Sequence, residues 1–341
     1  MGSRKGKQTI VYDSRPKILG AWSIAGVKEG EGPLRAWFDQ ILTDDSYGEK
    51  TWEKSETKML KEAVSQATLL AGLTVNDLDA LLSGDLINQL MSSTFMARDL
   101  GVPFLGLYGA CSTMTESLLL GSMVVDGGFG NRVAVCASSH YSTAERQFRL
   151  PLEHGNQRPP SAQWTVTGAG AMIVGKEDLP RAESAITVDC ATIGRIIDTG
   201  IKDVNQMGAA MAPAAVDTIA THLSDTGRTP DHYDAILTGD LASIGSRIAR
   251  EMLGEKGYPM DRRYDDCGCM IFDRSQDTHA GGSGCGCSGS VFAGRVYKGL
   301  RTGELKRVLL ISTGALLSTI SPQQGESIPG IGHAVALTTE G

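Results

Sequence analysis

One segment of this chain occurs twice, and the repeat constrains the fold more than any other feature. Residues 72–86 read GLTVNDLDALLSGDL and residues 227–241 read GRTPDHYDAILTGDL, so eight of fifteen aligned positions are identical without a gap. A helical pattern precedes each copy, over residues 54–71 and 212–223, and Pro213 falls in the expected first helical turn, where proline is tolerated. Each copy ends in an apolar run closed by Gly-Asp. Helix, turn and buried strand in this order is typical of a parallel α/β unit.

The two parts of the chain stay similar downstream of the repeat. Both contain a glycine-rich turn, a helical stretch and a later apolar run: Val102–Tyr108, Gly109–Ser112, a helix to about Val125 and Val133–Ala137 in the first part, and Gly281–Ser288, a helix to Leu300 and Val308–Ser312 in the second. Strands this apolar must be covered on both faces. We therefore expect an α/β fold in which two sheets enclose central helices, an α-β-α-β-α arrangement of two pseudo-duplicated halves, residues 1–178 and 179–341.

Composition and charge exclude several classes of partner. The 341 residues carry a formal net charge of -7, and 41% of them are hydrophobic. This composition is that of a globular protein with a large core, and its acidity gives no attraction for nucleic acid or an anionic membrane surface. No apolar stretch reaches the ~18 residues that cross a bilayer, and the start lacks a signal-peptide apolar region. We expect a soluble protein with its seven cysteines reduced.

The predicted layering resembles the thiolase-like superfamily, and so do three local features. These are Cys111 at a strand-to-helix turn, the segment Thr167–Ala171 and the turn Gly281–Gly284. A closer resemblance, from about Gly6 to Ala336, is to the stage V sporulation protein AD family. The segments that carry it are Lys28–Leu34, Gly84–Gln89, Thr143–Arg149, Met207–Ala215, Tyr264–Gly268 and Thr313–Ser318.

The family resemblance implies a function that composition and spacing do not. It implies a soluble, non-condensing thiolase homologue that binds dipicolinic acid or its calcium chelate in a pocket at Cys111, without a cofactor of its own. Calcium would arrive with the ligand, and the protein alone would hold no metal. The partners implied are membrane channel proteins of the same spore system, and the place is peripheral to the forespore or spore inner membrane. Thiolase-fold relatives commonly dimerise, and we expect that contact through Val133–Ala137.

Cys111 is the main candidate for a residue with a chemical role. It follows an apolar strand and begins a helix, where converging N–H groups and the helix dipole favour anions and are expected to lower the pKa of a thiol. The alternative is a buried cysteine that fills space. In catalytic relatives the corresponding thiol accepts an acyl group, so a condensing acyltransferase of the ketoacyl synthase III type is the competing function. A scaffold with a vestigial pocket is a third.

Two acidic residues stand where condensing relatives carry His and Asn, namely Asp240 and Asp266. Two carboxylates facing a thiolate repel a developing oxyanion, whereas condensation needs groups that stabilise it. The same oxygens suit Ca²⁺, so we expect Asp85, Asp240 or Asp266 to face the metal or accept hydrogen bonds from the ligand. Capping of a following helix is the equally weighted alternative for aspartates at strand ends.

Other polar residues are weaker candidates for ligand contacts. Guanidinium groups suit a planar dicarboxylate, although solvated ion pairs are the commoner role of arginine. His140 follows a strand, and His279 would be the first suspect for a missing catalytic base, although a histidine beside glycines is more often a solvent-facing loop residue. The predicted ligand-binding set is Cys111, Asp85, Asn88, His140, Arg146, Arg149, Asp240, Asp266 and Gly282, with Gln89 beside it.

Two further motifs are expected to be structural. Cys267-x-Cys269 and Cys285-x-Cys287 have one residue between the cysteines, whereas zinc sites usually have two or more, and alternate residues of a strand point apart. The turn Gly281–Gly284 lacks the Lys-Ser/Thr that would follow in a phosphate-binding loop. We expect close backbone packing at this turn.

Overall fold

The computed structural model describes residues 2–148, 158–177 and 185–339. Its strands are β1 Ser3–Lys5, β2 Thr9–Val11, β3 Lys17–Ala25, β4 Gln40–Ile41, β5 Ala80–Gly84, β6 Phe104–Gly106, β7 Arg132–Ser139, β8 Trp164–Thr165, β9 Gly168–Gly175, β10 Ile186–Thr192, β11 Ala235–Thr238, β12 Tyr264–Asp266, β13 Gly282–Ser283, β14 Arg307–Ala315 and β15 Gly330–Thr338. Its α-helices are α1 Val27–Gly30, α2 Trp52–Leu70, α3 Met91–Leu100, α4 Thr113–Asp126, α5 Tyr141–Phe148, α6 Met207–Thr226, α7 Ala242–Glu255, α8 Cys267–Met270, α9 Cys285–Val291 and α10 Tyr297–Arg301.

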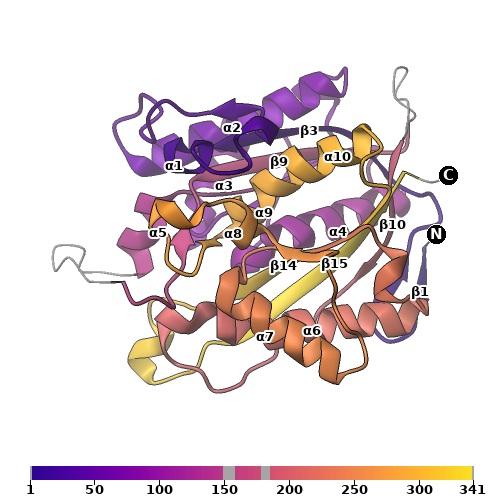
Figure 1. The fold of residues 1–341 in the computed structure, drawn as a ribbon. Helices are drawn as coiled ribbons and strands as arrows, with labels where there is room; N and C mark the ends of the chain where they lie inside the picture. The colour runs from indigo at the N-terminus through magenta and orange to yellow at the C-terminus, as the bar shows by residue number, and fades with distance from the viewer. Residues whose placement is uncertain (1, 149–157, 178–184, 340–341) are drawn as a thin grey trace.

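The strands follow the same order in the two halves of the chain. The first half runs β3-β9-β7-β5-β6 and the second runs β10-β15-β14-β11-β12. In each half the first three strands of this order are antiparallel neighbours and the last three are parallel neighbours. Helices α2 and α3 cover the outside of the first sheet, α6 and α7 that of the second, and α4 and α9 lie between them (Figure 1). The predicted layered, duplicated α/β fold is confirmed.

Two of the identical pairs in the repeat, the glycines at its start and Asp79 with Asp234, have the same role in both halves. Gly72 and Gly227 end helices α2 and α6 in the left-handed region, at φ 72° and 71°, which favours glycine. The carboxylate of Asp79 accepts the N–H groups of Asn131 and Arg132, and that of Asp234 accepts those of Lys306 and Arg307. Each aspartate thereby ties the start of one strand to the start of its parallel neighbour.

Helix α6 begins earlier than the sequence predicts, at Met207, so Pro213 lies inside the helix and not in its first turn. The extra turn packs against α7 through two glycines. A Cβ on Gly208 would stand 2.5 Å from the Leu241 carbonyl oxygen, and one on Gly245 would stand 2.5 Å from the Gly208 carbonyl oxygen. Tertiary contact of this kind contributes more to a helix than intrinsic propensity does, so the proline is tolerated.

Close backbone contact also seats the central helix α9 on the first sheet. A Cβ on Gly170 of β9 would lie 1.9 Å from the Gly289 carbonyl oxygen of α9. Nearby, a Cβ on Gly286 would lie 2.4 Å from the Gly168 carbonyl oxygen. The glycines of the Thr167–Ala171 segment therefore let a helix from the second half approach a strand of the first.

The two half-sheets are joined at their edges. β10 pairs with β3 through Ile186 with Ile18 and Thr187 with Lys17. Strand β2 of the predicted first half lies against β10 of the second half, and β8 pairs with β13 across the halves. The predicted boundary between residues 178 and 179 lies outside the described residues.

The expected dimer contact through Val133–Ala137 is wrong for this fold. These residues belong to β7, which pairs with β5 on one edge and with β9 on the other, so neither edge is open to a second chain. The strand at the outer edge of the first half is β6, and the side chain of its Leu105 is exposed. Across the described ranges, no helix combines the length and the apolar character that crossing a membrane requires.

Candidate functional site

Cys111 lies where the chain turns from β6 into α4. A 3-10 turn over Ala110–Ser112 precedes the helix, and Ala110 adopts a left-handed φ of 50°, which is uncommon for a residue with a Cβ. The turn leans on the second sheet, because a Cβ on Gly314 of β14 would lie 2.1 Å from the Gly109 carbonyl oxygen. Cys111 is consequently held between the halves with 7% of its surface exposed.

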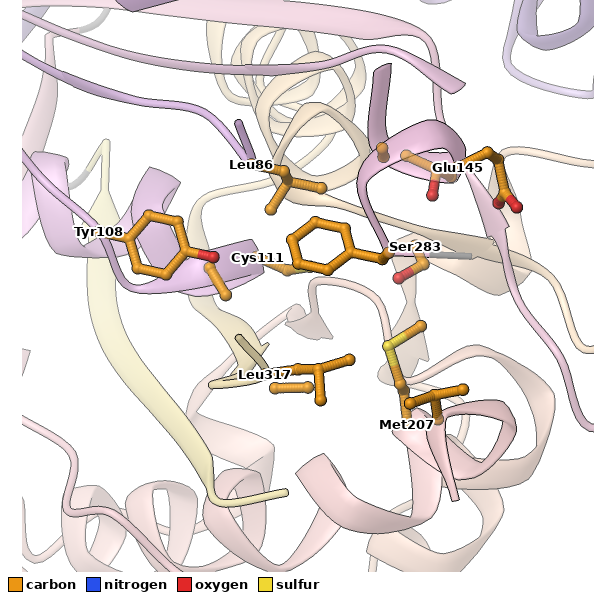
Figure 2. A pocket seen from close by; sticks show the side chains of 13 residues that line it. Leu86, Tyr108, Cys111, Glu145, Met207, Ser283 and Leu317 are labelled. Carbon is orange, nitrogen blue, oxygen red and sulfur yellow. The ribbon is translucent and has the colours of Figure 1, made fainter. Parts of the chain in front are cut away.

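Beside Cys111 lies a small, mostly apolar cavity. Its volume is about 50 Å³, several times the ~10–15 Å³ that one water molecule needs. In Figure 2, Tyr108 lies at one end, Glu145 and Ser283 lie at the other, and Met207 and Leu317 form a side opposite Leu86. The lining residues are Leu86, Tyr108, Ala110, Cys111, Ala144, Glu145, Phe148, Thr165, Val204, Met207, Ser283, Ala315 and Leu317.

The carboxyl group of Asp240 lies against the sulfur. It accepts hydrogen bonds from the hydroxyl of Thr313 at 2.7 Å and from the N–H of Gly284 at 3.2 Å, and it faces the thiol of Cys111. Burial raises the pKa of Asp240 to about 6, although these donors oppose the shift. Burial raises the pKa of the Cys111 thiol well above its ordinary value, and Asp240 raises it further. The sequence-based expectation of a lowered thiol pKa is wrong, because desolvation and the carboxylate outweigh the helix start.

Asp266 does not line the cavity. Its buried carboxylate accepts the N–H groups of Leu241 and Ala242, both at 2.8 Å, and that of Cys269 at 3.2 Å. The Thr238 hydroxyl donates to it at 2.7 Å. Asp266 therefore caps α8 and holds the turn into α7, which is the structural alternative considered for it. Burial raises its pKa to about 7.

Asp85, which occupies the same place in the repeat as Asp240, has a different environment. Its carboxylate accepts the N–H groups of Ile87 and Ser93, at 2.9 and 2.7 Å, and it orders the turn into α3. Close by, the buried Glu56 accepts the hydroxyls of Ser138 and Thr143 at 3.0 and 2.8 Å. Burial, and next the charge of Asp85, raise the pKa of Glu56 to about 8. This polar cluster underlies the site without opening into the cavity.

The two histidine candidates are directed elsewhere. His140 is buried, its Nδ1 accepts the N–H of Ser142 at 3.1 Å, and its Nε2 therefore donates to the carbonyl oxygen of Asp45 at 2.9 Å. Burial lowers the pKa of His140, so the ring is neutral. His279 is exposed, at a left-handed φ of 54°.

The remaining predicted ligand residues also lie outside the lining of the cavity. Asn88 is exposed and donates its N–H to Gln147, and Gln89 is exposed beside it. Arg146 forms an ion pair with Glu53 of α2. Gly282 packs against α8, where a Cβ would lie 2.9 Å from Ile271. Arg149 lies outside the described residues. Of the predicted set, the structure thus brings Cys111 and Asp240 together.

The cysteine pairs and the glycine turn have structural roles in the protein interior. Cys267 and Cys269 lie on α8 and Cys285 and Cys287 on α9, not on strands as the spacing argument assumed. Among the residues that the structure describes, no group of three His, Cys, Asp or Glu side chains is arranged to hold a metal ion. The N–H groups of Gly284 and Gly286 are taken by Asp240 and Ser139.

The polar end of the cavity was missed from the sequence. Glu145 belongs to the family-like segment Thr143–Arg149, in which the arginines, and not Glu145, were the predicted ligand contacts. It forms an ion pair with Arg158 at 3.4 Å, and their side chains are 7% and 14% exposed. The helical spacing of Ala144, Glu145 and Phe148 on α5 could have indicated a shared face.

Solved structures of other proteins have this fold. The chain superposes on 3-oxoacyl-[acyl-carrier-protein] synthase III from Aquifex aeolicus with a TM-score of 0.55, at 14% identity, over 95% of this chain and 99% of that one. It superposes on cerulenin-bound OleA from Xanthomonas campestris with a TM-score of 0.64, at 12% identity, over 97% and 98%. Two repeated halves that hold a cysteine at the helix start between them define a thiolase-like fold.

The sequence comparisons narrow that class to one family. The family model of stage V sporulation protein AD matches residues 6–338. Stage V sporulation protein AD of Bacillus subtilis strain 168 is 45% identical over 336 residues, which cover 98% of each chain. The chain belongs to the stage V sporulation protein AD family, as its sequence segments indicated.

Proposed function

We propose that this sporulation-family protein binds dipicolinate, or its calcium chelate, in the cavity beside Cys111 and does not transfer acyl groups. On the same family resemblance, we propose that it works with membrane channel proteins of the spore at the forespore or spore inner membrane. The ligand and these partners rest on family membership, and the chemistry of the cavity supports the first of them.

The observation that carries the proposal is the contact between Asp240 and Cys111. Acyl transfer needs a thiolate and then donors that stabilise an oxyanion. Here burial and a neighbouring carboxylate keep the thiol protonated. The carboxylate of Asp266, at the second acidic position, accepts backbone N–H groups and offers no donor to an oxyanion. His140 is turned to Asp45. The site therefore disfavours both the thiolate form of Cys111 and the oxyanion-like transition state of acyl transfer.

The composition of the cavity lining suits a small aromatic ligand that carries polar groups. Aromatic and aliphatic side chains surround most of it, with polar groups gathered at the end that Glu145 and Ser283 form (Figure 2). Apolar walls that hold a ring, with a few polar groups at one end, are the usual composition of a small-molecule site. A pyridine ring with carboxylates fits that division.

Calorimetry and mass spectrometry test the proposal together. Dipicolinate should release or absorb heat with the wild-type chain and with Cys111→Ser, because the sulfur forms no covalent bond. Ala315→Leu, which fills the cavity, should abolish the heat, whereas Gly254→Ala on an open part of α7 should not. Incubation with acetyl-CoA should leave the mass of Cys111 unchanged. An acyl adduct on Cys111, with no heat from dipicolinate, would establish the condensing-enzyme alternative instead.

A further inference from the structure

A second cavity lies at the opposite end of the second half-sheet from Cys111. Its volume is about 200 Å³, and the residues that line it are Asp189, Arg228, His232, Tyr233, Arg307, Ala336, Leu337 and Thr338. Arg307 begins β14, whereas Ala315, at the other end of the same strand, lines the cavity beside Cys111. At about 3.3 Å per residue, the nine residues of this strand separate the two cavities by about 25 Å. The second cavity is therefore a separate site.

The lining of this second cavity carries more positive than negative groups. It contains two guanidinium groups and an imidazole, and one carboxylate, that of Asp189. The chain as a whole carries a formal charge of -7, so the local balance is opposite to the overall one. Positive groups that line a concave surface concentrate the electrostatic potential there. The cavity therefore favours an anion.

Arg228 is held in place by the side chains around it. Its Nη2 lies 2.5 Å from the Asp189 carboxylate, and its Nη1 donates to the Tyr233 hydroxyl at 3.0 Å and to the Cys190 sulfur at 3.5 Å. The hydroxyl of Tyr233 is in turn hydrogen-bonded to the buried His222 at 2.6 Å. A guanidinium has five N–H donors, and these contacts within the described residues use three of them. Arg228 is thus preorganised and retains donors for a ligand.

The first half of the chain offers an internal comparison at the equivalent place. Arg132 begins β7 as Arg307 begins β14, and each carbonyl oxygen accepts the N–H of the repeat aspartate beside it. The guanidinium of Arg132 forms ion pairs with Glu177 at 2.8 Å and with Asp77 at 3.6 Å. By strand pairing, residue 340 corresponds to Glu177, and it lies outside the described residues. In the first half, two acids therefore neutralise the arginine at the start of the strand.

The second copy of the repeat differs from the first in the residues that reach this cavity. Three positions that are apolar or acidic in the first copy are cationic or hydrogen-bonding in the second: Leu73 and Arg228, Asp77 and His232, and Leu78 and Tyr233. All three residues of the second copy line the cavity. The second copy also has Asp231 where the first has Asn76, but Asp231 is not part of the lining. The two copies share a backbone arrangement, and the changed side chains make the second one cationic.

We propose that this cavity binds a phosphate group, carried by a free phosphate compound or by the head group of a lipid. A planar carboxylate is matched by one guanidinium fork, whereas the tetrahedral oxygens of a phosphate accept donors from several directions. Arg228, Arg307 and His232 supply such donors, and Arg228 already neutralises the carboxylate of Asp189. The site is independent of the cavity beside Cys111 and adds a second ligand to the proposed function.

The test is calorimetry of the full chain with inorganic phosphate, in a buffer that contains neither phosphate nor sulfate. The wild-type chain should bind phosphate, and sodium chloride at equal ionic strength should give no binding heat. His232→Asp, which restores the acid of the first copy, and Arg307→Gln should each weaken binding roughly tenfold to a hundredfold, because a charge-assisted contact is lost or opposed. Either variant suffices if the other does not fold. Arg132→Gln, at the equivalent strand start of the first half, is the matched control and should leave the affinity unchanged.

Sedimentation with vesicles distinguishes the two sources of the phosphate group. Retention on vesicles that contain phosphatidic acid, but not on phosphatidylcholine alone, would support a lipid head group if His232→Asp abolishes it. Heat from phosphate without retention would support a free phosphate compound. Neither heat nor retention in the wild-type chain, equal heat from sodium chloride, or equal losses in Arg132→Gln and Arg307→Gln would overturn the inference. Heat from dipicolinate should be the same in these variants, so failure here leaves the proposed function standing.

Discussion

The carboxyl group of Asp240 faces the thiol of Cys111. Cys111 lies in the turn that precedes helix α4 of the first half, and Asp240 lies near the end of the second copy of the repeat, so the contact joins the two halves of the chain. The pKa of Asp240 is raised to about 6, which leaves it mostly ionised at pH 7, and the thiol beside it is therefore kept protonated. The packing of the two halves thus places the Cys111 thiol at their junction and also lowers its reactivity.

Asp240→Asn should make Cys111 more reactive. Removing the carboxylate removes one of the two main causes of the raised thiol pKa, while the amide can still accept from Thr313. Alkylation of Cys111 by iodoacetamide, followed by mass spectrometry from pH 7 to 10, should be several-fold faster than in the wild-type chain. Asp85→Asn, at the equivalent position of the repeat, is the control. An equal alkylation rate in Asp240→Asn would show that burial alone controls the thiol.

Stability should fall as the pH rises towards 8. Glu56 has a folded pKa of about 8, above its ordinary value, so the folded chain binds more protons than the unfolded chain in this range. Its contribution is complete at acidic pH below the unfolded pKa and is lost as the pH rises through about 8. The loss is on the order of a few kcal/mol. Urea denaturation at pH 5 to 8.5 should show a shallower dependence in Glu56→Gln, and an unchanged dependence would contradict the assignment.

Asp266→Ala should destabilise the fold without removing the binding site. The substitution leaves three buried N–H groups and one hydroxyl without their acceptor, at a cost of about 2–4 kcal/mol. Urea denaturation measures the loss. Calorimetry below the unfolding range should show that dipicolinate still binds, because Asp266 lies outside the lining. Loss of binding in a folded variant would return Asp266 to the ligand site.

Gly170→Ala should be costly although it adds one methyl group. The new Cβ would lie 1.9 Å from the Gly289 carbonyl oxygen, so α9 must move away from β9 at a cost of about 1–3 kcal/mol or more. Gly254→Ala is the matched control, because it lies in helix α7 with open space around it. That change should stabilise the chain by roughly 0.5–1 kcal/mol. Similar thermal midpoints for the two variants would contradict the packing argument.

Much of the fold could be predicted, because the repeated residues act on nearby parts of the chain. Gly72, Gly227, Asp79 and Asp234 each act within a short span of the chain or at a neighbouring strand, so their spacing reveals the duplicated unit. The start of α6 could not be predicted, because it depends on Gly208 meeting Gly245 of another helix. The paired edges of β7 depend likewise on the order of the whole sheet.

The candidate site could be predicted only in part. Cys111 stands at a turn that its neighbours in sequence define. The position of an aspartate in the repeat does not predict its role. Asp85 and Asp240 are equivalent in the repeat, yet Asp85 orders a turn and Asp240 lies beside the thiol. The role of Glu145 depends on Arg158, and that pair is set by the Trp164 ring and not by a motif.

Strand β2 has a consequence for how the chain is made. Residues 9–11 find their sheet partner in Cys190–Thr192, almost two hundred positions later. As the polypeptide leaves the ribosome, this early strand has only β1 as a partner until more than half of the protein has been synthesised. The hairpin of β1 and β2 can therefore join the main sheet only after synthesis has reached the second half of the chain, and it pairs there with a strand of that half.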